Sequence, residues 1–367
     1  MKIQNVKLDM VEWNGTPWKT SYRMVFGQDV TLGVLTIETD EGIKGNAFLG
    51  SSRLGANHHY RGLIDFAKPF LIGKNPQDIG SIWKDLWKMN RSLSLNVIAS
   101  IDIALWDING KIANQPIHRL LGTCKEKIPV YSSTAFHELV EDYVEEAIKY
   151  KELGWNAHKI HPHGIPEKDI EICQKIRNSV GNNMKLMLDS MWAYDYENAL
   201  KVGRAIEELN FYWYEDPLVE EDIYNYKKLT KKLDIPVIAT EYIPGRFYGV
   251  PEWITQNATD IIRGDVVAMG GITPLVKLAH LAEAFNMNCE IHSGSGNSID
   301  NVANLHVILS IPNCEFYEFF PSTGENRFGL IEEIEFDKGY VTAPTKPGLG
   351  YEIDWDLLNK SHVTTIE

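Results

Sequence analysis

Three acidic residues stand at regular intervals in the middle of the chain, each at the end of a short apolar run. Asp189 closes KLMLD, Glu215 closes FYWYE and Glu241 closes VIATE, with 26 residues from each acid to the next. That interval is about the length of one strand, one loop and one helix, so the carboxylates are expected at the same end of three neighbouring parallel strands. Oxygen ligands there favour Mg²⁺, with Mn²⁺ as the second choice.

The ordinary interpretation of a single acid after a strand is a helix N-cap or a solvated loop residue. Three successive strands that each end on an acid are harder to explain in this way, because Glu is not among the preferred N-cap residues. The pattern therefore predicts a metal site with Asp189, Glu215 and Glu241 as its ligands.

Basic residues stand near these acids at two further places. Lys159 and His161 lie two positions apart in AHKIH, so on a strand their side chains share one face and His158 points to the other. His292 ends CEIH and Asp265 ends IIRGD, and on adjacent strands the carboxylate can fix the tautomer and orientation of the imidazole. The alternatives are a basic pair outside the barrel interior and a structural histidine.

A metal flanked by two sets of bases suits the removal of a proton α to a carboxylate. The metal and a cationic Lys would neutralise the enediolate that forms, while bases on either side move protons. A C–H group of such weak acidity is not deprotonated by His or Lys at a useful rate without this stabilisation.

The elements that must position these residues repeat at a nearly constant length. From about residue 127, short apolar strands alternate with helical segments, and the predicted strand ends are 24 to 28 residues apart. These ends fall at Ser133, His161, Asp189, Glu215, Glu241, Asp265, His292 and Glu318. Eight such units predict an α/β fold, a (β/α)₈-type barrel with a shortened last unit. A doubly wound open sheet is the alternative, and the regular unit length disfavours it.

The segments on either side of the barrel predict a second structural unit. Up to about residue 50 the pattern is that of antiparallel strands, and residues 61–121 show helical spacing. We expect an α+β capping domain at 1–125, the barrel at 126–320, and a tail at 321–367 that returns to complete the capping domain. The stretch from Ile331 to Asp354 alternates and would most simply rejoin the N-terminal sheet.

Two loops of the expected capping domain, near residues 14–29 and 50–61, are candidate lids over the barrel. They carry aromatic and cationic side chains that are unsuited to a core. The candidate substrate-binding residues are Arg23, Arg53, His59 and Arg61. The alternative is that these four are solvated loop residues.

Composition excludes several classes of partner. The 367 residues include 50 acids and 36 bases, a net charge of −14 without a long block of one sign, which argues against nucleic acid or an anionic membrane. No stretch approaches about 18 uninterrupted apolar residues and no signal-peptide pattern is present, so we expect a cytoplasmic protein. The four cysteines form no CxxC pair, which favours reduced thiols.

Together these motifs resemble the mandelate racemase subgroup of the enolase superfamily over essentially the whole chain. The resemblance is carried by ASIDIALWDINGKIANQPIHRLLG before the barrel, by HKIH, LMLD, WYEDP and ATE on the second to fifth strands, by RGDVVAMGGIT, IHSGSG and FYEFF on the sixth to eighth, and by PGLGYEID in the tail. It implies one Mg²⁺ on the three acids, a His292 and Asp265 dyad, and a Glu318 that hydrogen-bonds the substrate carboxylate or enediolate. A small-molecule sugar acid as substrate and a homo-oligomer are also implied.

The second strand departs from the subgroup's usual Lys-x-Lys motif, because this chain has Lys159-Ile160-His161. By position, His161 replaces the customary base and Lys159 the electrophilic partner. The hypothesis is that His161 acts on one face of the substrate while Lys159 tunes it and contacts the carboxylate; Lys159 or His292 is the alternative base.

The reaction most often implied by this resemblance is dehydration of a sugar acid by a Mg²⁺-dependent lyase. Racemisation or epimerisation, with His161 and His292 exchanging protons on opposite faces, is the alternative. A non-catalytic sugar-acid binding protein on the same fold is a third possibility, which the retained acids and bases disfavour. Arg263, Gly264 and Asp265 also form a cell-adhesion tripeptide, but their place at the end of a predicted barrel strand argues against adhesion.

Overall fold

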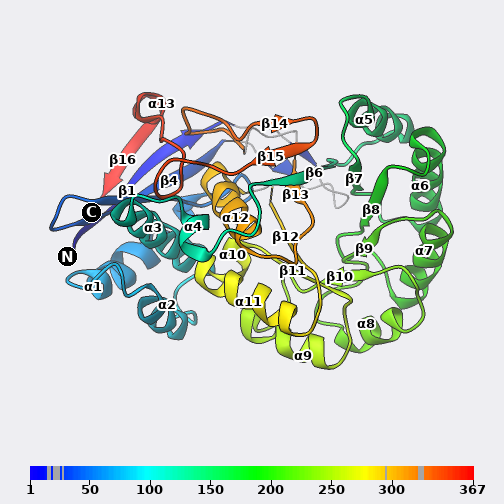
Figure 1. Ribbon diagram of the computed structural model, residues 1–367, viewed down its shortest axis with the longest axis horizontal. Coiled ribbons are helices and arrows are strands. Elements are labelled where there is room, and N and C mark those ends of the chain that lie inside the picture. The colour runs from blue at the N-terminus through cyan, green and yellow to red at the C-terminus, as the bar shows by residue number, and fades with distance from the viewer. Residues whose placement is uncertain (15–17, 20–24, 27–28, 294–295, 321–325) are drawn as a thin grey trace.

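An antiparallel sheet at one end of the molecule contains both the first and the last strand (Figure 1). The structure is a computed structural model that describes residues 1–14, 18–19, 25–26, 29–293, 296–320 and 326–367. The sheet has the order β16, β1, β4, β5, with bounds His362–Ile366, Ile3–Trp13, Val30–Thr39 and Lys44–Leu49. Strands β2 (Trp18–Lys19) and β3 (Val25–Phe26) form a separate ladder. The expected capping sheet, completed by the tail, is confirmed.

A buried helix joins this sheet to the rest of the molecule. Helices α1, α2, α3 and α4 span Lys68–Leu71, Ile79–Lys88, Leu95–Ala113 and Ile117–Leu121. Strand β5 approaches α3 so closely that a Cβ on Gly45 would lie 2.1 Å from the Ala104 carbonyl oxygen, so only glycine fits there. On its other side α3 accepts a hydrogen bond through Asp102 from the Thr273 N–H. The sheet is thereby fixed against the second half of the chain.

Eight parallel strands of the described chain form the barrel in the order in which they occur. Each pairs with the next from β6 to β12, and β13 pairs with β6. Their bounds are Lys127–Ser133 (β6), Ala157–Ile160 (β7), Lys185–Asp189 (β8), Trp213–Glu215 (β9), Val237–Ala239 (β10), Ile261–Gly264 (β11), Cys289–Ile291 (β12) and Tyr317–Phe319 (β13). Between β12 and β13 the Ser293 hydroxyl accepts the Glu318 N–H and donates to the Glu318 carbonyl, which links the ring at that point.

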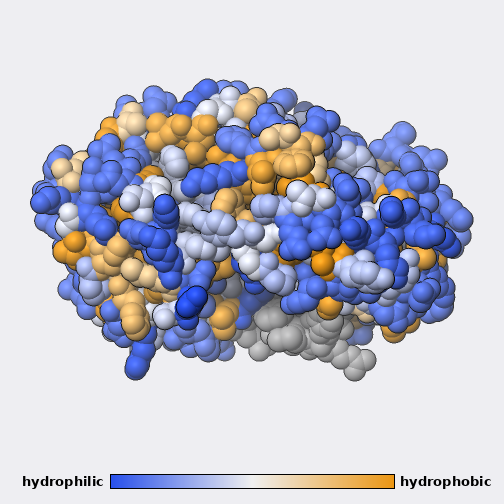
Figure 2. Space-filling model, turned by 90° about the horizontal axis from the view of Figure 1, so that it is seen from below, coloured by the Kyte–Doolittle hydropathy of each residue, from blue (hydrophilic) through white to orange (hydrophobic). Residues whose placement is uncertain are grey.

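Helices surround this ring of strands, as Figure 1 shows for α5 to α9 and α11. Their bounds are Val140–Glu152 (α5), Pro166–Val180 (α6), Tyr196–Glu208 (α7), Ile223–Thr230 (α8), Val250–Thr255 (α9), Val266–Met269 (α10), Ile272–Ala284 (α11) and Ser298–Ser310 (α12). The alternation of strand and helix from β6 onward agrees with the sequence prediction. No helix in the described ranges is long and apolar enough to cross a membrane. Figure 2 shows a face on which hydrophilic residues predominate and hydrophobic ones form separate patches.

The tail after β13 takes a different path from the one expected for Ile331–Asp354. Strands β14 (Phe336–Asp337) and β15 (Tyr340–Thr342) form a hairpin, and β15 pairs antiparallel with the first half of β6 in the barrel. The capping sheet is rejoined only beyond this stretch, by β16 after the short helix α13 (Trp355–Lys360). Alternation in the sequence identified strands here, but it does not specify which sheet edge a strand joins.

Candidate active site

The inward-facing residues of the barrel strands form an apolar layer with a charged layer above it. The apolar layer is one buried cluster: Tyr131, Ala157, Met187, Trp213, Ile238, Ile261 and Phe316. Two positions further along five of the strands stand the charged residues Lys159, Asp189, Glu215, Arg263 and Glu318, all of them buried. Because strand side chains alternate between faces, a spacing of two keeps them inside the barrel and moves them toward the carboxyl ends of the strands.

Lys159 lies in the middle of the charged layer. Its Nζ is 3.3 Å from Asp189 Oδ2, 3.1 Å from Glu215 Oε1 and 2.9 Å from Glu318 Oε1, and the side chain is 1% exposed. Burial by itself would lower the pKa of Lys159, but Glu215 and Glu318 raise it well above its ordinary value. The ammonium group is therefore suited to stabilise negative charge and unsuited to accept a proton at neutral pH.

His161 follows β7 directly and faces the same acids as Lys159. Its Nδ1 is 2.6 Å from the Thr134 carbonyl oxygen and its Nε2 is 2.9 Å from Asp189 Oδ2. Its backbone is held on both sides, because its N–H donates to Thr134 Oγ1 and its carbonyl accepts the Tyr143 hydroxyl. A carbonyl and a carboxylate only accept hydrogen bonds, so both ring nitrogens donate in this arrangement. When the ring is neutral and Nδ1 keeps its hydrogen on the Thr134 carbonyl, the lone pair is on Nε2.

The neighbouring His158 points away from this layer, as its place on the strand predicts. It is fully buried, and its Nδ1 is 2.7 Å from Ser132 Oγ. Burial lowers the pKa of His158 to about 4, so it packs as a neutral ring behind the strand.

His292 and Asp265, which directly follow β12 and β11, form a hydrogen-bonded pair. Nδ1 of His292 is 3.2 Å from Asp265 Oδ2 and 3.6 Å from Glu241 Oε1, and its Nε2 is 3.9 Å from Glu318 Oε2. Asp265 also accepts the N–H groups of Val267 and Ala268 at the start of α10. The same carboxylate therefore caps a helix and orients the imidazole. Burial would lower the pKa of His292, but Glu241, Glu318 and Asp265 raise it above the ordinary value.

Arg263 is a member of the charged layer that the sequence analysis did not assign to the site. It is fully buried, with NH2 2.6 Å from Glu318 Oε2 and NH1 3.1 Å from the Tyr131 hydroxyl. Its Nε lies 3.1 Å from Glu215 Oε1 as an ion pair without hydrogen-bond alignment, and 3.6 Å from Glu241 Oε2. The sequence did indicate an inward position for Arg263, because it lies two positions before Asp265 and strand side chains alternate between faces.

Glu318 accepts from both cations of the layer. Burial alone would raise the pKa of its carboxyl group, but Lys159 and Arg263, with His292, hold it well below the usual range. The group is therefore an anion, and in this state it accepts hydrogen bonds and does not donate one.

The three acids expected to bind metal lie on adjacent strands around these two cations. Asp189 and Glu215 are register partners on β8 and β9, and Glu241 follows β10 after Thr240, whose φ is 95°. Lys159 bridges Asp189 and Glu215, and Arg263 bridges Glu215 and Glu241. No group of three or more His, Cys, Asp or Glu side chains in the described ranges is preassembled to hold a metal ion. The donor set nevertheless fits Mg²⁺, since it is oxygen-only, buried and convergent.

A second buried acid holds the backbone on both sides of Glu241. The side-chain oxygens of Glu220 accept the N–H groups of Thr240 and Tyr242, the two residues that flank Glu241. Burial and the nearby Glu241 raise the pKa of Glu220 to about 8. Glu220 was not predicted, because its proximity to Glu241 arises from packing and no local motif indicates it.

The predicted loop residues occupy different places. Arg53 lines a cleft of about 170 Å³ together with Asp265 and His292. His59 is buried with its Nδ1 3.0 Å from Ser94 Oγ, the N-cap of α3, and Arg61 is exposed beside the Tyr60 hydroxyl. Neither is among the described residues that line the cleft. Arg23 lies outside the described residues.

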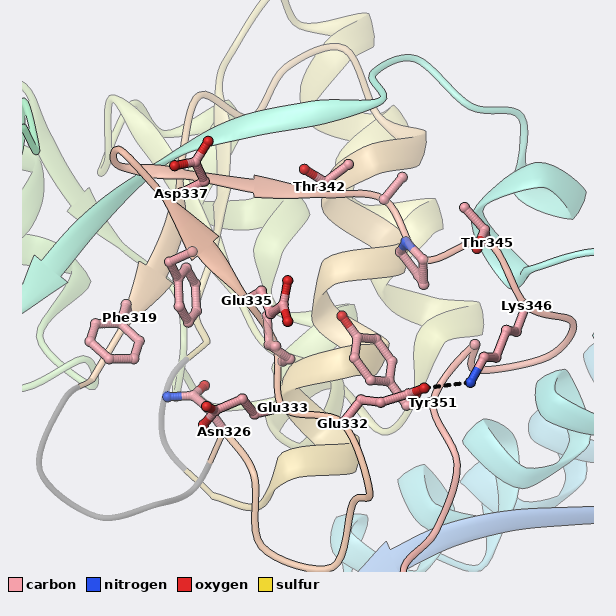
Figure 3. A pocket seen from close by; sticks show the side chains of 15 residues that line it. Phe319, Asn326, Glu332, Glu333, Glu335, Asp337, Thr342, Thr345, Lys346 and Tyr351 are labelled. Atoms are coloured by element: carbon pink, nitrogen blue, oxygen red, sulfur yellow. Dashed lines mark hydrogen bonds and ion pairs between the residues drawn. The ribbon is translucent and has the colours of Figure 1, made fainter.

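A larger cavity, about 790 Å³, lies on the tail side of the barrel (Figure 3). Figure 3 shows Glu332 directed toward Lys346, and Lys346 also pairs with Glu352. Its described lining contains none of the predicted catalytic or metal-binding residues. The smaller cleft beside the dyad is therefore the candidate active site.

Known proteins with similar sequences identify the family of this chain. Residues 3–122 match the model of the mandelate racemase / muconate lactonizing enzyme N-terminal domain, and residues 142–357 match the enolase C-terminal domain-like family. An arabinonate dehydratase of Saccharolobus solfataricus is 30% identical, over 78% of this chain and 79% of its own. An N-succinyl-L-Arg/Lys racemase of Bacillus cereus is 28% identical, over 98% of each chain.

A solved structure extends the similarity to the whole fold. The D-glucarate dehydratase of Agrobacterium tumefaciens complexed with magnesium superimposes with a TM-score of 0.90 and is 31% identical, covering 99% of this chain and 100% of its own. Both family models, the two-part fold and the charged layer agree. The chain belongs to the mandelate racemase / muconate lactonizing enzyme group of the enolase superfamily.

Proposed function

We propose that this protein is a Mg²⁺-dependent hydro-lyase that dehydrates a sugar acid. The observation that carries the proposal is the placement of two histidines at separate points of the strand ring, both facing one cluster of carboxylates and a buried ammonium group. His161 comes from β7 and His292 from β12, with four strands between them on one side of the ring. This arrangement provides a proton acceptor and a proton donor for one bound substrate.

Asp189, Glu215 and Glu241 are the residues that would hold the metal ion. When bound, Mg²⁺ would supply positive charge to the oxygens of the enediolate. Relatives of this superfamily are typically magnesium enzymes, and one similar structure is described as complexed with magnesium. The same three acids already contact two cationic side chains, so their oxygens are arranged around positive charge.

Lys159 stabilises the carboxylate of the substrate as negative charge moves onto it. Its raised pKa keeps it an ammonium ion, and its contacts with Asp189, Glu215 and Glu318 hold Nζ at the centre of the charged layer. This supports His161 as the residue on the second strand that removes the α proton.

The proton transfers follow from the hydrogen bonds of the two rings. Nε2 of His161 takes the proton from the carbon α to the carboxylate, because Nδ1 already donates to Thr134. The C–H electron pair forms the enediolate. On its collapse the β C–O bond breaks, and His292 donates the Nε2 proton so that the hydroxyl leaves as water. The enol product then takes up a proton to give a 2-keto-3-deoxy acid.

Epimerisation is the second candidate, because both histidines can exchange protons with the same carbon and a racemase is among the similar proteins. Incubation with Mg²⁺ and a panel of mono- and diacid sugars, followed by mass spectrometry, separates the two. Dehydration is indicated by the loss of one water. Epimerisation in D₂O leaves the skeleton and hydroxyl groups unchanged and incorporates deuterium. Binding of sugar acids without any exchange would instead support a non-catalytic protein.

A further inference from the structure

The ring of barrel strands has a seam between β12 and β13, where the pairing differs from that of the other strands. Each other pair of neighbouring barrel strands is joined by a parallel backbone ladder, including β13 with β6. In the described chain β12 and β13 share no ladder, and one backbone hydrogen bond, from the Cys289 N–H to the Asn313 carbonyl, joins β12 to the segment that leads into β13. Backbone ladders therefore hold β13 on one side only.

A serine hydroxyl replaces the ladder at the carboxyl end of the seam. Ser293 Oγ accepts the Glu318 N–H at 3.0 Å and donates to the Glu318 carbonyl oxygen, also at 3.0 Å. In a parallel sheet these two groups of one residue would bond to the backbone of the neighbouring strand. Because Ser293 is 1% exposed, water does not compete for these contacts. One hydroxyl group thus takes the place of two ladder bonds beside Glu318.

A carboxyl group joins the seam at the other end. Glu290 Oε1 accepts the Glu315 N–H at 2.9 Å and Oε2 accepts the Phe316 N–H at 3.3 Å, directly before the start of β13. Its strand neighbours Cys289 and Ile291 pack in the main hydrophobic core, so Glu290 faces the barrel interior, where it is 1% exposed. A carboxyl group buried in this way is costly unless it is hydrogen-bonded, and its partners here belong to the strand that follows.

The residue that β13 carries into the charged layer is Glu318. Its Oε1 is 2.9 Å from Lys159 Nζ and its Oε2 is 2.6 Å from Arg263 NH2. The two cations come from β7 and β11, on opposite sides of the seam strands, so one carboxylate reaches both only when β13 lies in one place. On the β12 side that place is set by the side chains of Ser293 and Glu290.

We infer that Ser293 and Glu290 are positioning residues, which fix Glu318 and through it the ammonium group of Lys159. The inference rests on the proposed function, in which Lys159 stabilises the enediolate. Ser293 and Glu290 act through β13 and do not touch the substrate. Negative charge on the enediolate develops in the transition state, so a displaced ammonium group lowers the rate of reaction more than it weakens substrate binding.

Hydrogen exchange of the full-length protein with Mg²⁺ measures how firmly β13 is held, independently of turnover. In Ser293→Ala the Glu318 N–H loses its acceptor inside the barrel, so peptides that cover residues 315–320 should exchange at least about 10-fold faster than in wild type. Glu290→Gln keeps one acceptor oxygen and places an NH₂ group where the other stood. It should accelerate the same peptides to a smaller extent.

Ser310→Ala is the matched control. Ser310 is a buried serine on α12, the helix between β12 and β13, and its hydroxyl group donates to the Val307 carbonyl of the same helix. The substitution removes an identical hydroxyl group near the seam without a contact to β13, so the exchange of residues 315–320 should stay at the wild-type rate.

Kinetics with a sugar acid that the wild type converts test the consequence for the reaction. Ser293→Ala should lower kcat by about 10- to 100-fold and change KM by less than about 3-fold. Glu290→Gln should lower kcat to a smaller extent. Ser293→Thr keeps a hydroxyl group at the same position and should restore both kcat and the slow exchange of residues 315–320. Ser310→Ala should match wild type in both measurements.

The outcomes separate this inference from the proposed function. Exchange at the wild-type rate in both Ser293→Ala and Glu290→Gln would overturn the inference. Faster exchange with an unchanged kcat would also overturn it, as would a low kcat in a Ser293→Thr variant whose exchange is that of wild type. Faster exchange in both variants of a protein that converts no acid in the panel supports the hold on Glu318 and contradicts the proposed reaction.

Discussion

Nε2 of His161 lies 2.9 Å from Asp189 Oδ2, so the proposed base and a proposed metal ligand are direct neighbours. His161 stands where a second lysine is usual on this strand. Only one of its ring nitrogens, Nε2, is placed to take up a proton. The contact therefore connects metal binding to the first proton transfer.

Replacement of His161 by Asn should abolish exchange of the α proton. The Asn amide can donate to the Thr134 carbonyl as Nδ1 does but cannot take up a proton, so exchange in D₂O, followed by proton NMR, should slow by about 10²- to 10⁴-fold. His163→Asn, two residues later, is the matched control and should exchange at the wild-type rate. Exchange that persists in the His161 variant would assign the base to Lys159 or His292.

Replacement of His292 by Asn separates dehydration from epimerisation. If His292 acts only as the acid, the variant should still exchange the α proton while formation of the keto acid falls by about 10²- to 10⁴-fold. The keto acid is measured as its semicarbazone and the exchange by NMR. The exposed His280→Asn is the control. Loss of exchange and product formation to the same extent would instead indicate that His292 acts on the α carbon.

Glu220→Gln should weaken metal binding without removing a ligand. One end of the new amide carries hydrogens and cannot accept the Thr240 or Tyr242 N–H, so the backbone around Glu241 should shift. We expect a loss of about 10- to 100-fold in Mg²⁺ affinity, measured by calorimetry. The exposed neighbour Glu221→Gln serves as control, and equal affinities of the two variants would show that Glu220 has no positioning role.

Arg263→Leu should destabilise the protein and make its stability dependent on Mg²⁺. The substitution leaves Glu215 and Glu318 with less compensating charge inside the barrel, which should lower the free energy of unfolding by about 3–5 kcal/mol. Urea denaturation with and without Mg²⁺ measures this, and the ion should restore part of the loss. Arg204→Leu is the surface control. A loss below about 1 kcal/mol would mean that Lys159 alone balances these acids.

His306 should contribute to unfolding in mild acid. Burial lowers its pKa from 6.5 to about 3 in the folded protein, so between these pH values the unfolded chain binds one more proton. Stability should therefore fall as the pH decreases from 6.5 toward 3, by up to about 1.4 kcal/mol per pH unit from this residue. Urea denaturation at several pH values should show a smaller slope for His306→Asn than for wild type. His280→Asn should keep the wild-type slope.

The repeat of strand and helix made much of the fold predictable. Because side chains alternate between the two faces of a strand, Asp189, Glu215 and Glu318 lie on the inward face. A spacing near 26 residues brings successive strand ends together. The capping sheet was also predictable, because the residues near the N-terminus show the pattern of antiparallel strands. These features depend on local sequence alone.

Contacts between distant segments were harder to predict. Glu220 holds Glu241 from a different loop, and His59 packs against the cap of α3 although its loop suggests a substrate contact. Arg263 was not predicted, because a fully buried arginine is rare and its partners Tyr131 and Glu318 come from other strands. In each case the partner is set by packing, which the local pattern does not contain.

The acceptor that fixes the tautomer of His161 is the main-chain carbonyl of Thr134, and this has an evolutionary consequence. Every amino acid at position 134 offers the same carbonyl oxygen, but the Thr134 hydroxyl also accepts the His161 N–H. Only serine or threonine at this position keeps both contacts. Selection on the choice of reacting nitrogen therefore acts on the shape of the loop after β6 and on a single hydroxyl group.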